Sequence, residues 1–248
     1  WLLNSLHACL GGTRRPGPSV IHDAFQGTVR VTTEAAAATA AACRGDGSDN
    51  DDGDSTAAAG TAVETPFLFL TVDVPPPPLF KDALARNIIP QVPIFSCLSK
   101  FDGRTSQEMT NGDRRRYVIT RLPRHLILHV KRFSRNTQGF VEKNTTIVNT
   151  PVRNLDLAAY CDASATAIAT PSTKYDLLSS VQHDGSPEKG SYRVYVHFRA
   201  NKSWYELQDL HCSDVHPQLV SVSESYIQFY ASQQSLAERE PVMPMQKD

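Results

Sequence analysis

The sequence predicts an α+β fold in which antiparallel β-strands predominate. In residues 126–131 and 192–199, every second side chain is apolar or aromatic. This period of two is typical of strands with one buried face. Helical periodicity is confined to short stretches, such as residues 94–101. The 248 residues suffice for one large domain or two small ones with a buried core.

The chain opens with a helix that strands follow. Leucines recur at helical spacing through residues 2–10, and a glycine pair comes directly after them. Because no helix-start signal precedes this helix, we expect further residues before Trp1. Residues 18–32 are rich in apolar and β-branched side chains and predict strand, with Gly27 as a turn or bulge.

Residues 34–64 differ in composition from the rest of the chain. They hold 11 Ala, 4 Gly, seven acidic residues and one Arg. Such a segment cannot bury enough apolar surface to offset its ordering entropy. We therefore expect a disordered acidic insertion within a domain, and interpret it as a solvated loop rather than a binding tail.

The remaining elements are mostly strands. Residues 67–72 predict a strand closed by a spacer of four prolines, Pro75–Pro78. The residues after Ala231 are polar and are expected to fray. Further elements are expected as a short helix at 94–101 and as strands at 126–131, 192–199, 204–207 and 226–230.

Composition excludes several classes of function. The net charge of −1 and the pI near 6.8 argue against binding polyanions by bulk attraction. No apolar run reaches the roughly 18–20 residues that span a bilayer, so no membrane contact is expected. Five scattered cysteines indicate a reducing compartment and not a disulfide scaffold.

No metal or cofactor site is expected either. The near-pairs His125/His129 and Cys212/His216 are not joined by the second pair that a four-ligand zinc site needs. No glycine-rich phosphate loop is present, and no cysteine has a recognisable nucleophile setting. Ser191 lies near His183, but no nucleophile elbow surrounds it.

Basic residues gather in one part of the sequence. Two interpretations remain open: a patch that contacts RNA or an acidic protein surface, and solvated strand edges balanced by acids elsewhere. The cluster holds eight bases and no acid within 22 positions: Arg114, Arg115, Arg116, Arg121, Arg124, Lys131, Arg132 and Arg135.

Motifs in the second half resemble those of ubiquitin-specific proteases, and they occur in that family's order. The segment Leu122–Phe133 is similar to its LPxxLxxxxKRF strand. The other similar blocks are Val148–Pro151 with Leu155–Leu157, Tyr175–Leu177 with His183–Gly185 and Gly190–Tyr192 (the histidine box), Trp204–Asp209, and Ser225–Tyr230.

The resemblance implies the papain-like thumb, fingers and palm architecture of that family. Residues 1–33 would hold the end of a thumb helix and the first fingers strands, and 34–64 the disordered insertion. Residues 65–232 would form the fingers and palm, and 233–248 a flexible tail.

Two departures from the family's pattern concern catalysis. Ser191 occupies the place of the histidine that acts as general base, and Gln208 that of the orienting Asp or Asn. A serine hydroxyl has no useful basicity near neutral pH. The zinc-binding cysteine pairs of the fingers are also missing from residues 30–33 and 108–116. The resemblance therefore implies a pseudo-deubiquitinase and not an enzyme.

Further blocks narrow the resemblance to one branch, the catalytically inactive splicing factors of the U4/U6.U5 tri-snRNP. This branch implies a nuclear scaffold that assembles or stabilises the tri-snRNP, with its large core protein, GTPase and RNA helicase as partners. Contact with snRNA would involve the basic cluster. The blocks are residues 1–13, 25–27, 89–93, 140–149, 183–185 and 204–210.

Two alternatives remain. A residual deubiquitinase could use an unconventional base such as His183 or His197. A ubiquitin-binding module without catalysis is the other, although loss of the finger zinc argues against the usual grip on ubiquitin.

Overall fold

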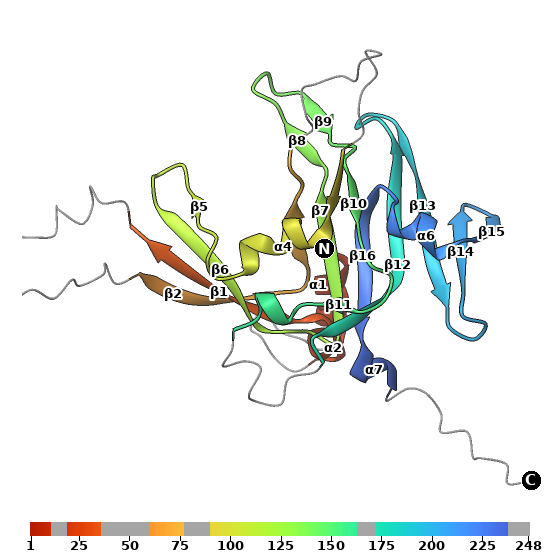
Figure 1. Cartoon of the computed structure of the whole chain (residues 1–248), viewed down its shortest axis with the longest axis horizontal. Helices are drawn as coiled ribbons and strands as arrows, with labels where there is room; N and C mark the ends of the chain where they lie inside the picture. Colours follow the sequence, from red (N-terminus) through yellow and green to blue (C-terminus); the bar gives the residue numbers. More distant parts are fainter. Residues whose placement is uncertain (11–18, 36–59, 77–89, 163–171, 238–248) are drawn as a thin grey trace, which may run out of the picture.

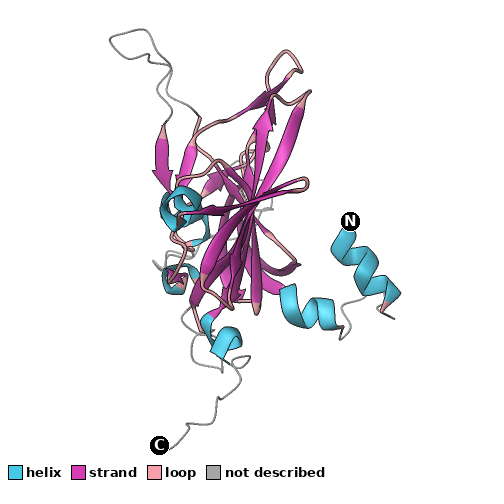
Figure 2. Ribbon diagram, turned by 90° about the vertical axis from the view of Figure 1, so that its right-hand side faces the viewer, coloured by secondary structure: helices cyan, strands magenta, loops and turns pink. Residues whose placement is uncertain are grey.

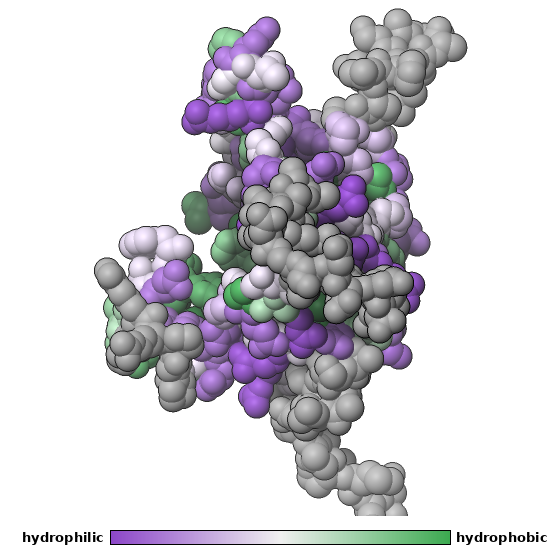
Figure 3. Space-filling model, turned by 90° about the vertical axis from the view of Figure 1, so that its left-hand side faces the viewer, coloured by the Kyte–Doolittle hydropathy of each residue, from purple (hydrophilic) through white to green (hydrophobic). Residues whose placement is uncertain are grey.

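The computed structural model describes residues 1–10, 19–35, 60–76, 90–162 and 172–237. Its strands form two principal sheets, and its helices are short (Figure 1). Almost all strand pairs are antiparallel, so the expected α+β class is confirmed. Hydrophilic and hydrophobic side chains are interspersed on the face that Figure 3 presents.

The helical elements are few and brief. Figure 2 shows the first two as a pair beside the sheets. In chain order they are α1 (Leu2–Cys9), α2 (Val20–Phe25), α4 (Ile94–Leu98), η1 (Ser99–Phe101), η2 (Ala158–Tyr160), α6 (Pro217–Ser221) and α7 (Gln233–Ala237).

Sixteen strands are present in the described residues. They are β1 (Gly27–Glu34), β2 (Thr61–Phe67), β3 (Leu70–Asp73), β4 (Gln91–Pro93), β5 (Gln107–Glu108), β6 (Arg114–Arg121), β7 (His125–Lys131), β8 (Phe133–Arg135), β9 (Val141–Lys143), β10 (Ile147–Asn149), β11 (Leu155–Asp156), β12 (Lys174–Gly185), β13 (Gly190–Phe198), β14 (Ser203–Gln208), β15 (His211–Val215) and β16 (Ser225–Ser232).

The two principal sheets differ in size and in order. The four-stranded sheet has the order β2-β1-β6-β5. The eight-stranded sheet runs β15-β14-β13-β12-β16-β7-β3, with β11 pairing β12 off this path. In that sheet β3 is parallel to β7. The pairs β10–β4 and β8–β9 are separate two-stranded sheets.

The core lies against β7 and its neighbours. Leu126, Leu128 and Val130 are fully buried, which confirms the face predicted from their alternation, and Ile127 on the opposite face is buried as well. Leu70 and Val72 on β3 pair with Leu128 and Val130 and extend the same apolar layer.

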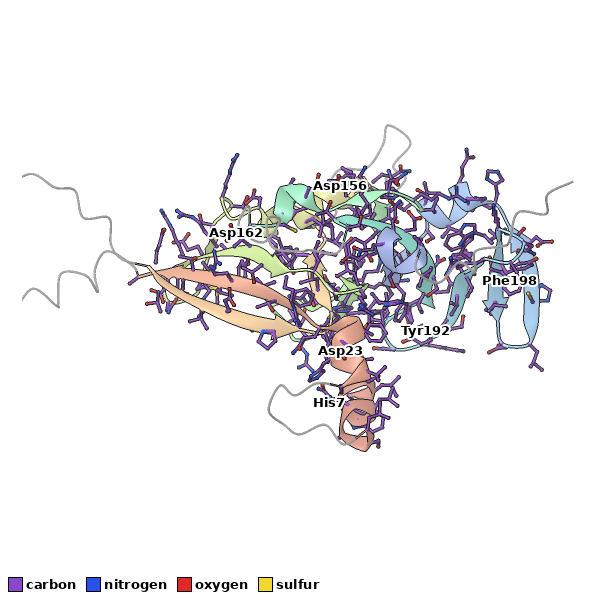
Figure 4. The ribbon with its side chains drawn as sticks, turned by 90° about the horizontal axis from the view of Figure 1, so that it is seen from below. His7, Asp23, Asp156, Asp162, Tyr192 and Phe198 are labelled. Carbon is purple, nitrogen blue, oxygen red and sulfur yellow. The ribbon has the colours of Figure 1, made fainter. Side chains whose placement is uncertain are left out.

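The alternation in β13 has a different outcome. Tyr195 is its buried residue, whereas Tyr192 and Phe198 are 57% and 54% exposed. Figure 4 shows these two labelled residues on β13, with Phe198 toward its far end. The period of two is present, but the more apolar face of β13 points largely to solvent.

The strand predicted over residues 18–32 is wrong in its first half. Residues 20–25 form α2, because the Ser19 hydroxyl accepts a hydrogen bond from the His22 amide at 3.2 Å and caps the helix. The predicted helix at 1–10 is confirmed as α1, and its glycine stop lies outside the described residues. The helix predicted at 94–101 is α4 followed by η1.

The boundaries of the predicted insertion and of the next strand also differ. Residues 61–64 pair with β1 as part of β2 and are therefore not disordered. Residues 67–72 do not form one strand, since β2 ends at Phe67 and β3 begins at Leu70 in the other sheet. Residues 36–59 and the end of the proline run lie outside the described residues.

The predicted flexible tail begins too early. Residues 233–237 form α7, and the Ser235 amide donates to the Ser232 hydroxyl at 3.2 Å. Ser235 is itself buried. Residues 238–248 lie outside the described part of the chain.

Candidate functional site

Ser191 and Gln208 lie on neighbouring strands at the same end of the eight-stranded sheet. Ser191 is exposed near the start of β13, and Gln208 is the last residue of β14. Since β13 and β14 are antiparallel with Val194 opposite Leu207, the start of one strand meets the end of the other. The structure therefore brings together the two positions at which the motifs depart from the protease pattern.

Neither side chain offers a general base. A base that acts near neutral pH needs a pKa close to 7, and neither a hydroxyl nor a carboxamide has one. A histidine would have to supply it from nearby. Two histidines, His183 and His197, were candidates from the sequence.

The His183 ring is enclosed. It is 6% exposed, and its centroid lies 5.2 Å from that of Phe133 and 5.1 Å from that of Tyr192, with edge-on geometry. A Cβ added at Gly190 would lie 2.2 Å from His183 Nε2. The same Cβ would lie 2.5 Å from the Asp184 carbonyl oxygen, so glycine is required at this position, where the imidazole packs on the backbone before Ser191.

His197 lies at the other end of β13. It is six positions beyond Ser191 in the sequence, which corresponds to about 20 Å along a strand. Its ring stacks on Trp204 with centroids 5.1 Å apart. Burial, with Arg153 as the next cause, lowers the pKa of His197. This histidine is too distant to act at the Ser191 position.

An ion-pair network ties together the strands that carry the site. Arg193 on β13 bonds Asp184 on β12 at 2.6 Å and Glu206 on β14 at 3.2 Å. The hydrogen bond that Arg193 donates to the Asp184 carboxylate is the main cause that raises the pKa of Arg193. Sequence reasoning missed this network, because the three residues face one another only through the strand register.

The basic cluster is not a single patch. Arg114, Arg115, Arg116 and Arg121 lie on β6 of the four-stranded sheet, whereas Lys131 ends β7 of the other sheet. Several of these bases already have partners: Arg116 pairs with Glu34 at 2.7 Å and Lys131 with Asp73 at 3.8 Å, and Arg121 donates to the Gln26 carbonyl at 3.1 Å. Arg124, between β6 and β7, and Arg135, the last residue of β8, are exposed.

Arg132 is wrongly included in that surface cluster. It is 1% exposed and donates from Nε to the Ser225 carbonyl at 2.6 Å. Its Nη1 donates to the carbonyls of Asn144 at 3.0 Å and Thr146 at 2.6 Å. Its role is to join chain segments in the interior and not to contact RNA.

Two of the described cysteines, Cys97 and Cys161, have raised thiol pKa values. Cys97 is buried, and burial raises its pKa; burial and Asp156 raise the pKa of Cys161 to about 11. Within those ranges no group of three or more His, Cys, Asp or Glu could hold a metal ion. None of the helices described there is long and apolar enough to cross a bilayer.

Comparison with known proteins identifies the family. A sequence model described as "Ubiquitin carboxyl-terminal hydrolase" matches residues 1–230. The chain belongs to this family. Ubiquitin carboxyl-terminal hydrolase 39 of Mus musculus and of Homo sapiens are each 41% identical to it over 233 residues, covering 93% of this chain and 40% of those proteins.

Another relative is named for splicing. The probable mRNA-splicing protein ubp10 of Schizosaccharomyces pombe (strain 972 / ATCC 24843) is 34% identical over 239 residues, covering 93% of this chain and 46% of that protein. The chain thus spans about 40–46% of the length of these curated relatives.

Solved structures confirm the ubiquitin-specific-protease fold. The Ubp8-Sgf11-Sgf73-Sus1 SAGA DUB module matches with a TM-score of 0.67 at 20% identity, over 94% of this chain and 47% of that chain. The same module bound to monoubiquitin gives 0.65 at 18% identity, over the same shares of the two chains. At this identity the likeness shows the fold alone.

Proposed function

We propose that the protein is a catalytically inactive ubiquitin-specific-protease-like scaffold that assembles or stabilises the spliceosomal tri-snRNP in the nucleus. Membership of the hydrolase family and the splicing name of one relative support this function. Because the chain spans less than half of those relatives, the proposal concerns the whole protein to which this domain belongs.

The observation that carries inactivity is the environment of Ser191. Its position in the histidine box holds a hydroxyl, and Gln208 replaces the orienting carboxylate or amide. The candidate base His183 is enclosed by Phe133, Tyr192 and the backbone of Gly190. None of these three side chains can therefore accept a proton from a nucleophilic thiol.

The partners follow from the same proposal. They are the large core protein, the GTPase and the RNA helicase of the tri-snRNP. A sheet that takes no part in catalysis still presents strand edges and faces to which partner proteins can bind.

Affinity purification of the tagged full-length protein from nuclear extract tests the scaffold function. We expect tri-snRNP proteins and the U4, U5 and U6 RNAs to be recovered in comparable amounts. Their absence from the purified material, while the tagged protein itself is recovered intact, would overturn the proposal.

A residual deubiquitinase is the second candidate, favoured by the hydrolase names of the relatives. Turnover of a fluorogenic ubiquitin substrate and labelling by a ubiquitin probe with a thiol-reactive C-terminus decide between the two. We expect no turnover by the full-length protein. Turnover by the Ser191→His variant alone would assign inactivity to this position, whereas turnover by the unaltered protein would establish the enzyme.

A further inference from the structure

A pocket of about 410 Å³ opens at the end of β13 that is remote from Ser191. It is lined by residues of β12, β13, β14 and α7, the last helix of the described chain. His197, six positions after Ser191, lines it, so the pocket is about 20 Å from the degenerate catalytic position. The proposed scaffold function does not involve this pocket.

The rim of the pocket carries a surplus of positive charge. Arg153, Arg199 and Lys202 line it against one carboxylate, Asp176. That carboxylate already accepts hydrogen bonds from the Asn154 amide at 2.9 Å and from Gln233 Nε2 at 3.0 Å. Among the described residues no ion pair involves Arg153 or Lys202. The rim is therefore complementary to an anionic ligand.

The position of Lys202 is fixed by its turn. Its φ of 58° lies in the left-handed region. The preceding residue, Asn201, accepts a hydrogen bond from the Ser203 amide at 3.0 Å and donates to the Tyr205 hydroxyl at 2.6 Å. A rim that is already ordered loses less conformational entropy when a ligand binds.

The interior of the pocket is mainly apolar. Val152, Leu178 and Leu236 line it together with Trp204. Trp204 is 5% exposed and stacks on His197, and burial, followed by Arg153, lowers the pKa of that histidine. The His197 ring is thus neutral near pH 7 and acts as a wall of the pocket rather than as a further cation.

These features favour a peptide over single-stranded RNA. Sites for single-stranded nucleic acid combine a basic groove that follows the backbone with exposed aromatic faces on which bases stack. Here the Trp204 indole is buried, and the other apolar lining residues are aliphatic. An apolar peptide side chain with acidic neighbours fits both the interior and the rim.

We propose that this pocket docks a short acidic peptide segment of a partner protein. One apolar side chain enters between Val152, Leu178 and Leu236, and the flanking carboxylates bind Arg153 and Lys202. Arg199 already donates to the Leu236 carbonyl at 3.4 Å. The inference deepens the proposed scaffold function, on which its biological setting rests, by giving the chemistry of one partner segment.

Fluorescence anisotropy with the full chain tests the proposal. The probe is a fluorescein-labelled peptide with a central leucine between two glutamates on each side. We expect saturable binding that weakens at least tenfold in the Arg153→Glu/Lys202→Glu variant. The Arg104→Glu/Lys189→Glu variant changes the charge equally at exposed positions outside the pocket and should bind as the unaltered chain does.

Changes in the probe keep the test valid even if the pocket variant folds poorly. Replacing the central leucine by serine, or the glutamates by lysines, should each abolish saturation. Equal binding of these probes, or equal weakening in both double variants, would overturn the proposal.

Two competitors identify other occupants. A labelled oligouridylate that binds more tightly than the peptide through Arg153 and Lys202 would assign the pocket to RNA instead. A peptide of residues 46–54 that binds there more tightly than the probe would make the occupant a segment of this chain. Either result overturns the partner peptide.

The pocket and the scaffold function can fail separately. Peptide binding without recovery of the tri-snRNP in affinity purification would refute the scaffold function and leave the pocket standing. Recovery of the tri-snRNP without saturable peptide binding would refute only the pocket.

Discussion

Arg132 has the largest of the fully buried side chains in the described residues. It donates to the carbonyl of Ser225 on β16 and to those of Asn144 and Thr146 in the connection between β9 and β10. Burial lowers its pKa to about 10, against the attraction of Glu224, so the guanidinium remains charged at neutral pH. A buried charge of this kind stabilises the fold only while its hydrogen bonds are intact.

We expect Arg132→Met to lower the free energy of unfolding by about 3–5 kcal/mol, because three buried carbonyls lose their donor. Urea denaturation monitored by tryptophan fluorescence measures the change. Arg135→Met, at an exposed position, is the matched control and should stay within about 0.5 kcal/mol. Similar values for the two variants would show that the buried hydrogen bonds contribute little.

His129 makes stability depend on pH. Burial, reinforced by Lys131, lowers its pKa from the ordinary 6.5, so the unfolded chain binds a proton more readily than the native one. The stability that the neutral ring contributes is therefore lost as the pH falls below about 6.5. We expect the thermal midpoint to fall between pH 7 and pH 5, and to fall less in His129→Gln.

The control for that measurement is His211→Gln, at an exposed position on β15. It should keep the slope of the unaltered chain. A slope in His129→Gln as steep as that of the control would exclude His129 as its source.

For individual residues, the sequence identifies the functional positions better than it predicts which groups surround each side chain. The motifs single out Ser191 and Gln208, and the structure places them on neighbouring strands of one sheet. The burial of Arg132 could not be foreseen, because Ser225, whose carbonyl it binds, is 93 residues away in the chain. Likewise, the packing of His183 on Gly190 depends on the β12–β13 register.

Among the elements, α2 depends on a single cap. The Ser19 hydroxyl bonds both the His22 amide and, at 2.6 Å, the His7 ring of α1. His7 also stacks on His22 at 3.7 Å, and Figure 4 shows His7 and Asp23 on these two adjoining helices. One side chain thus both starts α2 and attaches it to α1.

We expect Ser19→Ala to weaken α2 locally by about 1 kcal/mol, because the first turn loses its cap. Amide hydrogen exchange of residues 20–25 should accelerate several-fold, and Ser19→Asp should restore most of the protection. Ser96→Ala, at an exposed position of α4, is the control. Unchanged exchange in Ser19→Ala would rule out the capping role.

The type of an element, helix or strand, was predicted correctly where the local sequence pattern and the long-range packing favour the same structure. The helix at 1–10 and the strand at 126–131 follow their periodicity. Residues 20–25 do not, because β-branched Val20 and Ile21 favour strand while Ser19 starts a helix. The strand at 67–72 is divided because the chain changes sheets between Phe67 and Leu70.

Across the whole molecule, residues 35–60 connect two paired strands. Thr33 and Thr61 are direct partners in the β1–β2 ladder, so a tight hairpin can replace the connection. The sequence predicts no fixed structure for most of this segment, and closing a long flexible loop has an entropic cost.

Replacing residues 36–59 by a short Gly-Ser linker should therefore raise the free energy of unfolding by about 1–2 kcal/mol. Thermal and urea denaturation measure the gain, and recovery of the tri-snRNP should not change. A loss of stability would show instead that the segment packs on the sheets.

The strand order of the eight-stranded sheet has a consequence for biosynthesis. Its central strand β16, which pairs with both β12 and β7, comes last in sequence among its strands. A nascent chain that ends before Ser225 would expose two unpaired strand edges, which promote aggregation. We expect chains terminated after Glu224 to sediment, whereas chains terminated after Ala237 should not. The sheet can therefore close only when the ribosome has almost finished this domain.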